Sequence, residues 1–197
     1  MILVFRRTGQ RRYSVEAHRT GCPDLVMDPA PGYDPLMPHD LMHLIVEAQL
    51  GLTRGIFGQL AAGGDAGTFH VPFDARKGTR DLSRARKDVK ARGEKLLREG
   101  RGDSERSERA TYICWQEWLA RSSSNDRKKQ AQSMVKQAQQ VKEVAGDTEL
   151  HALNPRKLDE ICATLDRLSA RWSSLEVGES MAVRWPDLAL VTGHESN

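Results

Sequence analysis

The chain has 197 residues, of which 39% are hydrophobic and 29% charged, with three cysteines and a formal net charge of +3. This composition excludes a collagen-like or wholly disordered chain, and the odd, widely spaced cysteines exclude a disulfide-stapled miniprotein. No window approaches the roughly 18 apolar residues of a spanning helix, and the apolar start is too short for a secretory signal. We expect a single domain over residues 1–197, cytoplasmic, with reduced thiols and no membrane contact.

Residues 1–20 have the pattern of a β-hairpin. Two strands, over 1–7 and 12–19, flank a turn at Gly9. Apolar and polar residues alternate in the second strand, where the apolar ones are Tyr13, Val15 and Ala17. The following segment, 22–38, is rich in Pro, Asp and Gly, so we expect an irregular loop there.

Helical patterns occupy the middle of the chain. Residues 38–63 predict a pair of buried helices: the first starts at Pro38 and stops at Gly51, and the second is capped by Thr53. Residues 76–173 predict a helical region whose apolar residues recur at three- and four-residue spacing. These faces favour packing on the protein's own core, with a homodimer through the amphipathic helices as the alternative.

A last strand is predicted near the C-terminus. Met181, Val183 and Trp185 alternate with other residues and are followed by Pro186, and the tail 186–197 is expected to be frayed. This strand can close a small sheet with the N-terminal hairpin. The predicted fold class is therefore α+β, mostly helical, with a small antiparallel sheet built from both ends of the chain.

One polar strip stands out on the first buried helix. His39 and His43 are four residues apart, so both imidazoles lie on one side of a helix that is otherwise almost entirely apolar. This spacing lets one helix give two ligands to a single metal ion, zinc or another divalent cation. A third ligand must come from elsewhere. The nearby groups are Asp34, Gln59, Asp65 and His70, of which we take His70, on a loop that can reach the helix.

Two carboxylates accompany the histidines. Asp40 occupies the position that a general-base Glu takes in His-Glu-x-x-His metalloproteases, although its side chain is shorter. Glu47 is about 12 Å from His39 along the axis, too far to be a third ligand, and is placed to accept a hydrogen bond from His43. Both are candidate catalytic residues. The alternatives are a structural network of neutral imidazoles and an acid–base site without metal.

The residues around this strip resemble a known family. His39-Asp40-Leu41-Met42-His43, followed by Thr53-Arg54-Gly55-Ile56-Phe57-Gly58-Gln59, is similar to the His-Asp-x-x-His…Gly-Glu motif of the ubiquinone-biosynthesis metal-binding family, the fourth Coq protein. The resemblance covers about 25 residues. It implies a helical protein with a divalent-metal site formed by His39, Asp40 and His43, with Gln59 in the place of the motif's Glu.

A basic segment follows the histidine helices. Residues 76–109 contain 13 basic and seven acidic side chains but no aromatic residue. Nucleic-acid binding proteins commonly add aromatic residues that stack on bases, so this pattern favours a solvated, salt-bridged helix. Three function classes remain open: a metal-dependent protein centred on His39 and His43, a non-enzymatic interaction or regulatory protein, and a nucleic-acid binder. Apart from the homodimer alternative, the partner is unknown, and nucleic acid is the least favoured one.

Overall fold

The computed structural model describes residues 1–73 and 78–192. The centre of the fold is an antiparallel sheet of five strands in the order β3-β2-β1-β4-β5. The strands are β1 (Ile2–Gly9), β2 (Arg12–His18), β3 (Leu25–Ala30), β4 (Ser180–Arg184) and β5 (Leu190–Val191). The described residues also form six helices, α1 (His39–Leu50), α2 (Ile56–Ala61), α3 (Thr79–Glu99), α4 (Arg101–Arg121), α5 (Asn125–Ala152) and α6 (Pro155–Ser173).

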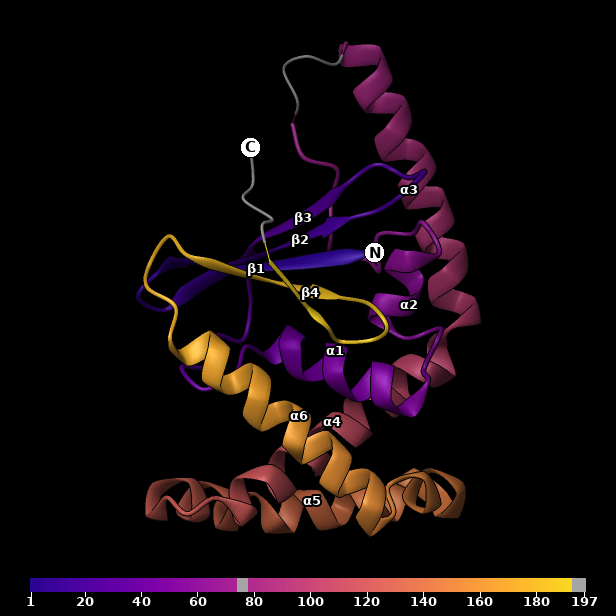
Figure 1. Cartoon of the computed structure of the whole chain (residues 1–197). Coiled ribbons are helices and arrows are strands. Elements are labelled where there is room, and N and C mark those ends of the chain that lie inside the picture. Colours follow the sequence, from indigo (N-terminus) through magenta and orange to yellow (C-terminus); the bar gives the residue numbers. More distant parts are fainter. Residues whose placement is uncertain (74–77, 193–197) are drawn as a thin grey trace.

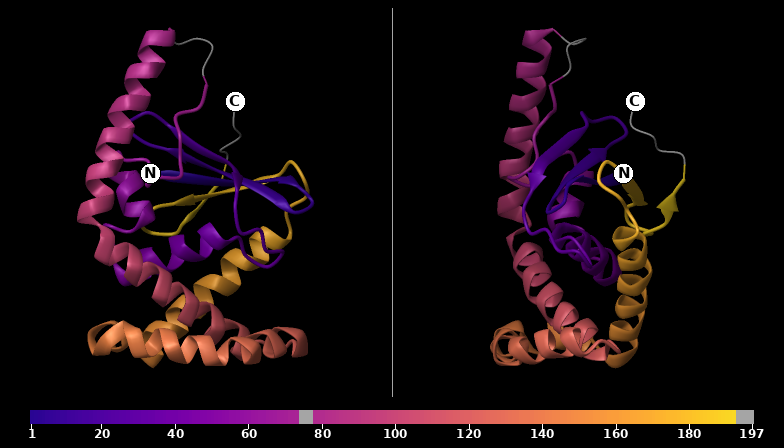
Figure 2. Two further views of the ribbon diagram at one scale, coloured as in Figure 1. Left: turned by 180° about the vertical axis from the view of Figure 1, so that it is seen from behind. Right: turned by 90° about the vertical axis from the view of Figure 1, so that its left-hand side faces the viewer.

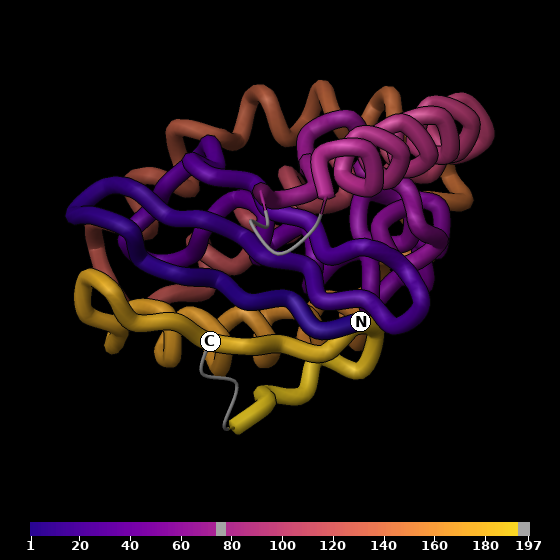
Figure 3. Tube along the Cα trace, turned by 90° about the horizontal axis from the view of Figure 1, so that it is seen from above, coloured from indigo at the N-terminus to yellow at the C-terminus, as the bar shows by residue number. Residues whose placement is uncertain are grey.

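The helices are layered against one face of the sheet. Helices α1 and α6 lie directly beneath it, and α5 crosses below them, farthest from the strands (Figure 1). Helix α3 stands at one end of the sheet and continues into α4, which descends toward α5 (Figure 2). Seen from above, α3 lies on the β3 side, whereas β5 forms the opposite edge (Figure 3). Helix α1 is therefore enclosed between the sheet and the other helices.

The core lies between the sheet and helices α1 and α6. Alternate strand residues face the helices because successive side chains of a strand point to opposite sides. The sheet contributes Leu3, Phe5, Tyr13, Val15 and Val183 to this core. Helices α1 and α6 contribute Leu41, Leu44, Ile45, Leu165, Leu168 and Trp172. The rings of Tyr13 and Trp172 meet edge to face at 5.9 Å between centroids. Each such side chain stabilises the fold by roughly 1.5–3 kcal/mol relative to an exposed one.

The predicted fold class is confirmed. The N-terminal hairpin forms with Phe5 opposite Val15, and β4 pairs with β1 so that Leu3 faces Val183. The expectation of an irregular loop over 22–38 was wrong, because β3 lies within it and pairs with β2. A strand at the edge of a sheet tolerates proline, which explains why its Pro and Asp content misled the prediction.

The tail was also more ordered than expected. Residues Leu190–Val191 form β5, which pairs with β4, so part of the 186–197 tail belongs to the sheet. Positions 193–197 lie outside the described residues.

Within the described part of the chain, no helix has the length and apolarity needed to cross a membrane. Cys114 and Cys162 are buried and Cys22 is partly exposed, and all three are free thiols.

The helical segments form as the patterns predict, with differences at their ends. Helices α1 and α2 fall within 38–63, and α3 to α6 within 76–173, although positions 76 and 77 lie outside the described residues. The residue that precedes α2 is Gly55, not Thr53, so the predicted cap was wrong. Helix α5 is interrupted at Gly146, whose φ of 68° and ψ of 161° are not helical.

Candidate metal centre

The two histidines of α1 converge as their spacing predicts. Helix α1 follows Pro38 and ends at Gly51, whose left-handed φ of 65° is one that glycine adopts without strain. His39 and His43 lie one turn apart, and their ring centroids are 4.5 Å apart. The two Nε2 atoms face each other at 3.3 Å. The predicted geometry of this pair is confirmed.

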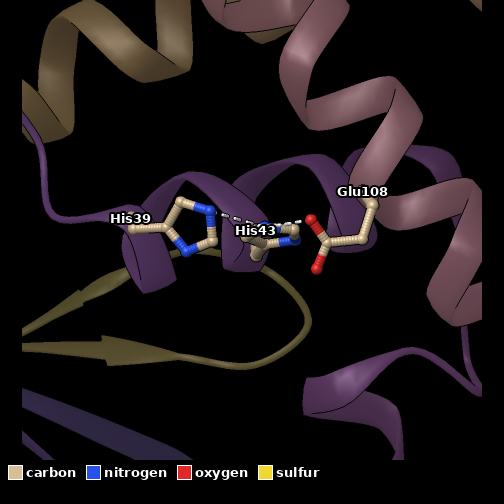
Figure 4. A group of neighbouring side chains, drawn as sticks. All are labelled: His39, His43 and Glu108. Carbon is tan, nitrogen blue, oxygen red and sulfur yellow. Dashed lines mark hydrogen bonds and ion pairs between the residues drawn. The ribbon is translucent and has the colours of Figure 1, made fainter. Parts of the chain in front are cut away.

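A carboxylate from α4 completes the group. Glu108 points toward the histidines, and its carboxylate oxygen lies 3.7 Å from His43 Nε2 (Figure 4). One ligand atom from each of His39, His43 and Glu108 lies within 4.8 Å of the other two. We call these three residues the His–Glu group. His43 is fully buried, whereas His39 and Glu108 are exposed, so the group opens to solvent on one side.

Behind His43, a buried chain of hydrogen bonds leads to Glu47. His43 Nδ1 lies 2.9 Å from Ser107 Oγ, and the Ser107 hydroxyl donates to Glu47 Oε1 at 2.9 Å. The Glu47 carboxylate also accepts the backbone N–H groups of Ile56 and Phe57, each at 2.9 Å. Glu47 thereby satisfies free donors at the start of α2. The predicted hydrogen bond from His43 to Glu47 was wrong, because the Ser107 hydroxyl lies between the two side chains and bonds to both.

Burial controls the charge states of these groups. Burial first, and the neighbouring His39 second, lower the pKa of His43 to about 3, so its imidazole is neutral at physiological pH. A neutral imidazole is the form that binds metal ions. Burial also raises the pKa of Glu47 to about 7, although the donors from Phe57, Ser107 and Ile56 favour its charged form. At pH 8, the His43 imidazole is therefore neutral and the Glu47 carboxyl is mainly ionised.

Asp40 is buried next to the His–Glu group but is not part of it. Its carboxyl contacts the hydroxyl of Tyr13 on β2, which also bonds to the Pro31 carbonyl. Burial is the main cause that raises the pKa of Asp40, and the Tyr13 hydrogen bond opposes it. Asp40 therefore ties α1 to the sheet, and its predicted role as a general base stays a prediction.

The other groups named as third ligands lie elsewhere. The backbone of His70 pairs with Val26 beside the sheet, at 2.9 and 3.0 Å, and the side chain is not in the His–Glu group. Asp34 accepts a hydrogen bond from the backbone N–H of Leu36, and Asp65 accepts one from the backbone N–H of Gly67. The Gln59 side chain donates to the Arg54 carbonyl.

Glu108 was not predicted from the sequence. The available signal was Ser107 and Thr111, two polar residues on the buried side of α4.

The resemblance to the ubiquinone-biosynthesis family stays a prediction. In the structure, the carboxylate beside His39 and His43 comes from Glu108, and Gln59 is not in the group. Within the described part of the chain, the His–Glu group is the one set of His, Cys, Asp or Glu residues with this geometry.

Comparison with protein-family models, curated proteins and solved structures gave no match to this chain.

Proposed function

We propose that this protein binds one divalent cation, with zinc as the first candidate, through His39, His43 and Glu108. The observation that carries the proposal is the 3.3 Å separation of the two facing Nε2 atoms. Two nitrogens bound at about 2.0–2.1 Å to a tetrahedral zinc ion are about 3.3–3.4 Å apart. The histidines therefore stand at the required separation without a change in α1.

The three ligand groups, two imidazoles and one carboxylate, support a metal site that water or a substrate can reach, and not a purely structural one. Two imidazoles and one carboxylate are typical of zinc sites that leave the fourth position to water or substrate. His39 and Glu108 are exposed, so this fourth position faces solvent. A bound zinc ion would supply Lewis-acid activation of a water or a carbonyl group.

A structural histidine network is the competing function. The same 3.3 Å contact fits an N–H···N hydrogen bond, and His43 is already held from behind by Ser107. In that case the two histidines only stabilise α1, which fits the non-enzymatic interaction or regulatory class. The two functions differ in one property, which is the response of the folded protein to added metal.

Thermal melts with chelator and with added zinc separate the two functions. A ligand that binds only the folded state raises stability by about 2.7 kcal/mol at 100 times its Kd. We expect wild-type protein to bind one zinc ion and to melt at a higher temperature with zinc. Glu108→Gln should lose most of this gain with little effect in chelator, because the Glu108 side chain is 63% exposed. Glu105→Gln, on the same helix, is the matched control and should keep the gain.

His43→Ala gives a second comparison. If the histidines share a metal, this variant should lose stoichiometric zinc as well as the zinc-dependent rise in melting temperature. If they form only a network, it should lose about 1–3 kcal/mol equally with and without zinc, because buried partners are left unpaired. A wild-type melting curve that is indifferent to zinc would end the metal proposal.

A further inference from the structure

The hydrogen-bond chain behind His43 is closed off from water. The exposed fractions of His43 and Glu47 are 0%, and that of Ser107 is 1%. His43 and Glu47 both belong to α1, and Ser107 of α4 lies between their side chains. A second hydroxyl, that of Thr111, lies 3.4 Å from the same His43 Nδ1. A buried chain of this kind has no solvent molecules with which to exchange partners, so its donors and acceptors can be assigned one by one.

Glu47 accepts every hydrogen bond at its end of the chain. At pH 8 the Glu47 carboxyl is mainly ionised, and an ionised carboxylate only accepts hydrogen bonds. Glu47 receives the N–H of Ile56, the N–H of Phe57 and the O–H of Ser107. Serine has a single hydroxyl hydrogen, and this hydrogen is directed at Glu47. Toward His43, the Ser107 oxygen can therefore only accept. The hydrogen bond at 2.9 Å must be donated by His43 Nδ1–H.

The protonation state of the second ring nitrogen of His43, Nε2, is set by the hydrogen on Nδ1. A neutral imidazole carries one N–H, and the hydrogen bond made by one nitrogen determines the state of the other. With the hydrogen on Nδ1, Nε2 holds a lone pair. That lone pair faces His39 Nε2 at 3.3 Å and the Glu108 carboxylate at 3.7 Å. It points to the place where a cation would be bound.

We propose that Ser107, oriented by Glu47, is a positioning residue that fixes His43 as the Nδ1–H tautomer and so directs the Nε2 lone pair into the His–Glu group. The tautomer is a property of the metal-free protein and holds whether or not a cation binds. The effect of Ser107 on metal affinity, in contrast, rests on the proposed function. Hydrogen-bonded partners of this kind change metal affinity by about 10–100-fold when they are removed.

The tautomer can be read directly by long-range ¹H–¹⁵N correlation NMR of the histidine rings. The measurement uses full-length protein with chelator at pH 8. We expect the wild-type His43 ring to give the pattern of the Nδ1–H tautomer, and Ser107→Ala to shift it toward the Nε2–H pattern. Thr111→Val removes the more distant hydroxyl while keeping the side-chain shape, and should leave the pattern unchanged. An Nε2–H pattern in wild-type protein would overturn the proposal without recourse to any variant.

Zinc titration provides the second measurement. Ser107→Ala should weaken zinc binding by about 10–100-fold, whereas Thr111→Val should change it less than about threefold. If the wild-type tautomer is Nδ1–H but zinc does not bind, the proposed function fails and the positioning role of Ser107 stands. If zinc binds and Ser107→Ala alters neither the tautomer nor the affinity, the positioning role fails and the metal site stands.

Discussion

The buried carboxyl of Glu47 predicts a measurable loss of stability as the pH rises. Burial raises its pKa from 4.5 in a free side chain to about 7 in the folded protein. The folded state therefore holds the Glu47 proton more tightly than the unfolded state. The stabilisation linked to this proton is fully present below pH 4.5 and is lost as the pH rises through about 7.

The size of this loss in unfolding free energy follows from the rise in the pKa of Glu47. One pKa unit corresponds to about 1.4 kcal/mol, so the rise from 4.5 to about 7 gives about 3 kcal/mol. Glu47→Gln keeps the size of the side chain and removes the titration. The variant also loses a fixed amount of stability, because an amide cannot accept from all three donors, but this loss does not depend on pH.

Urea unfolding followed by circular dichroism, with chelator at pH 4.5 and at pH 8, measures both proteins. The difference in unfolding free energy, wild type minus Glu47→Gln, should be smaller at pH 8 by about 3 kcal/mol. Taking the difference cancels the titration of all other groups. Glu105→Gln, an exposed carboxyl on α4, measures the effect of removing any glutamate. A difference that stays constant between the two pH values would refute the claim that burial of Glu47 perturbs its titration.

Three further variants test other parts of the fold. Gly32→Ala should cost about 1–3 kcal/mol and weaken zinc binding, because Gly32 has a φ of +72° and an added Cβ would lie 2.6 Å from His39 Cβ. Urea unfolding and zinc titration check both effects. Asn154→Ala should cost about 1 kcal/mol in urea unfolding, because the Asn154 side chain caps α6 at Lys157. Replacing Arg84, Arg86 and Lys87 on α3 by Gln should change unfolding stability by less than about 1 kcal/mol. A loss of random-sequence RNA or DNA affinity with a weaker salt dependence would instead support the nucleic-acid class.

The half of the site that lies on one helix could be predicted from the sequence. The positions of His39, His43 and Glu47 follow from the helical repeat, and an apolar helix with a polar strip must be buried with partners for that strip. Both features depend only on residues near one another in the chain. The convergence of the two Nε2 atoms at 3.3 Å is a consequence of local geometry.

Glu108 could not be found in this way. It lies in the basic segment 76–109, where charged side chains are so frequent that one more glutamate carries no signal. Its place in the site depends on the packing of α4 against α1, two helices far apart in the chain. Ser107 and Thr111 contain the missing information, because two hydroxyls one turn apart on the buried side of α4 need polar partners.

Strand β3 was missed for a related reason. Its sequence, Leu25–Ala30, contains an Asp-Pro pair that locally favours a turn. The strand forms because its backbone pairs with β2, with Val15 opposite Met27, and because Leu25 and Met27 enter the core. Pairing and burial of this kind involve residues that are distant in sequence, so a local pattern cannot reveal them.

The buried polar strip of α1 is complete without a cation, and this determines what a metal can do here. Asp40 is satisfied by Tyr13, His43 by Ser107, and Glu47 by the start of α2. Within the described residues, the buried side-chain atoms that lack a partner are Arg7 Nε and Gln59 Oε1, neither of which belongs to the strip. Small zinc domains unfold without metal because the free energy of metal binding supplies their folding free energy. Here His39 and Glu108 are exposed, so chelator should leave the fold intact, and a cation would add function to a scaffold that is already folded.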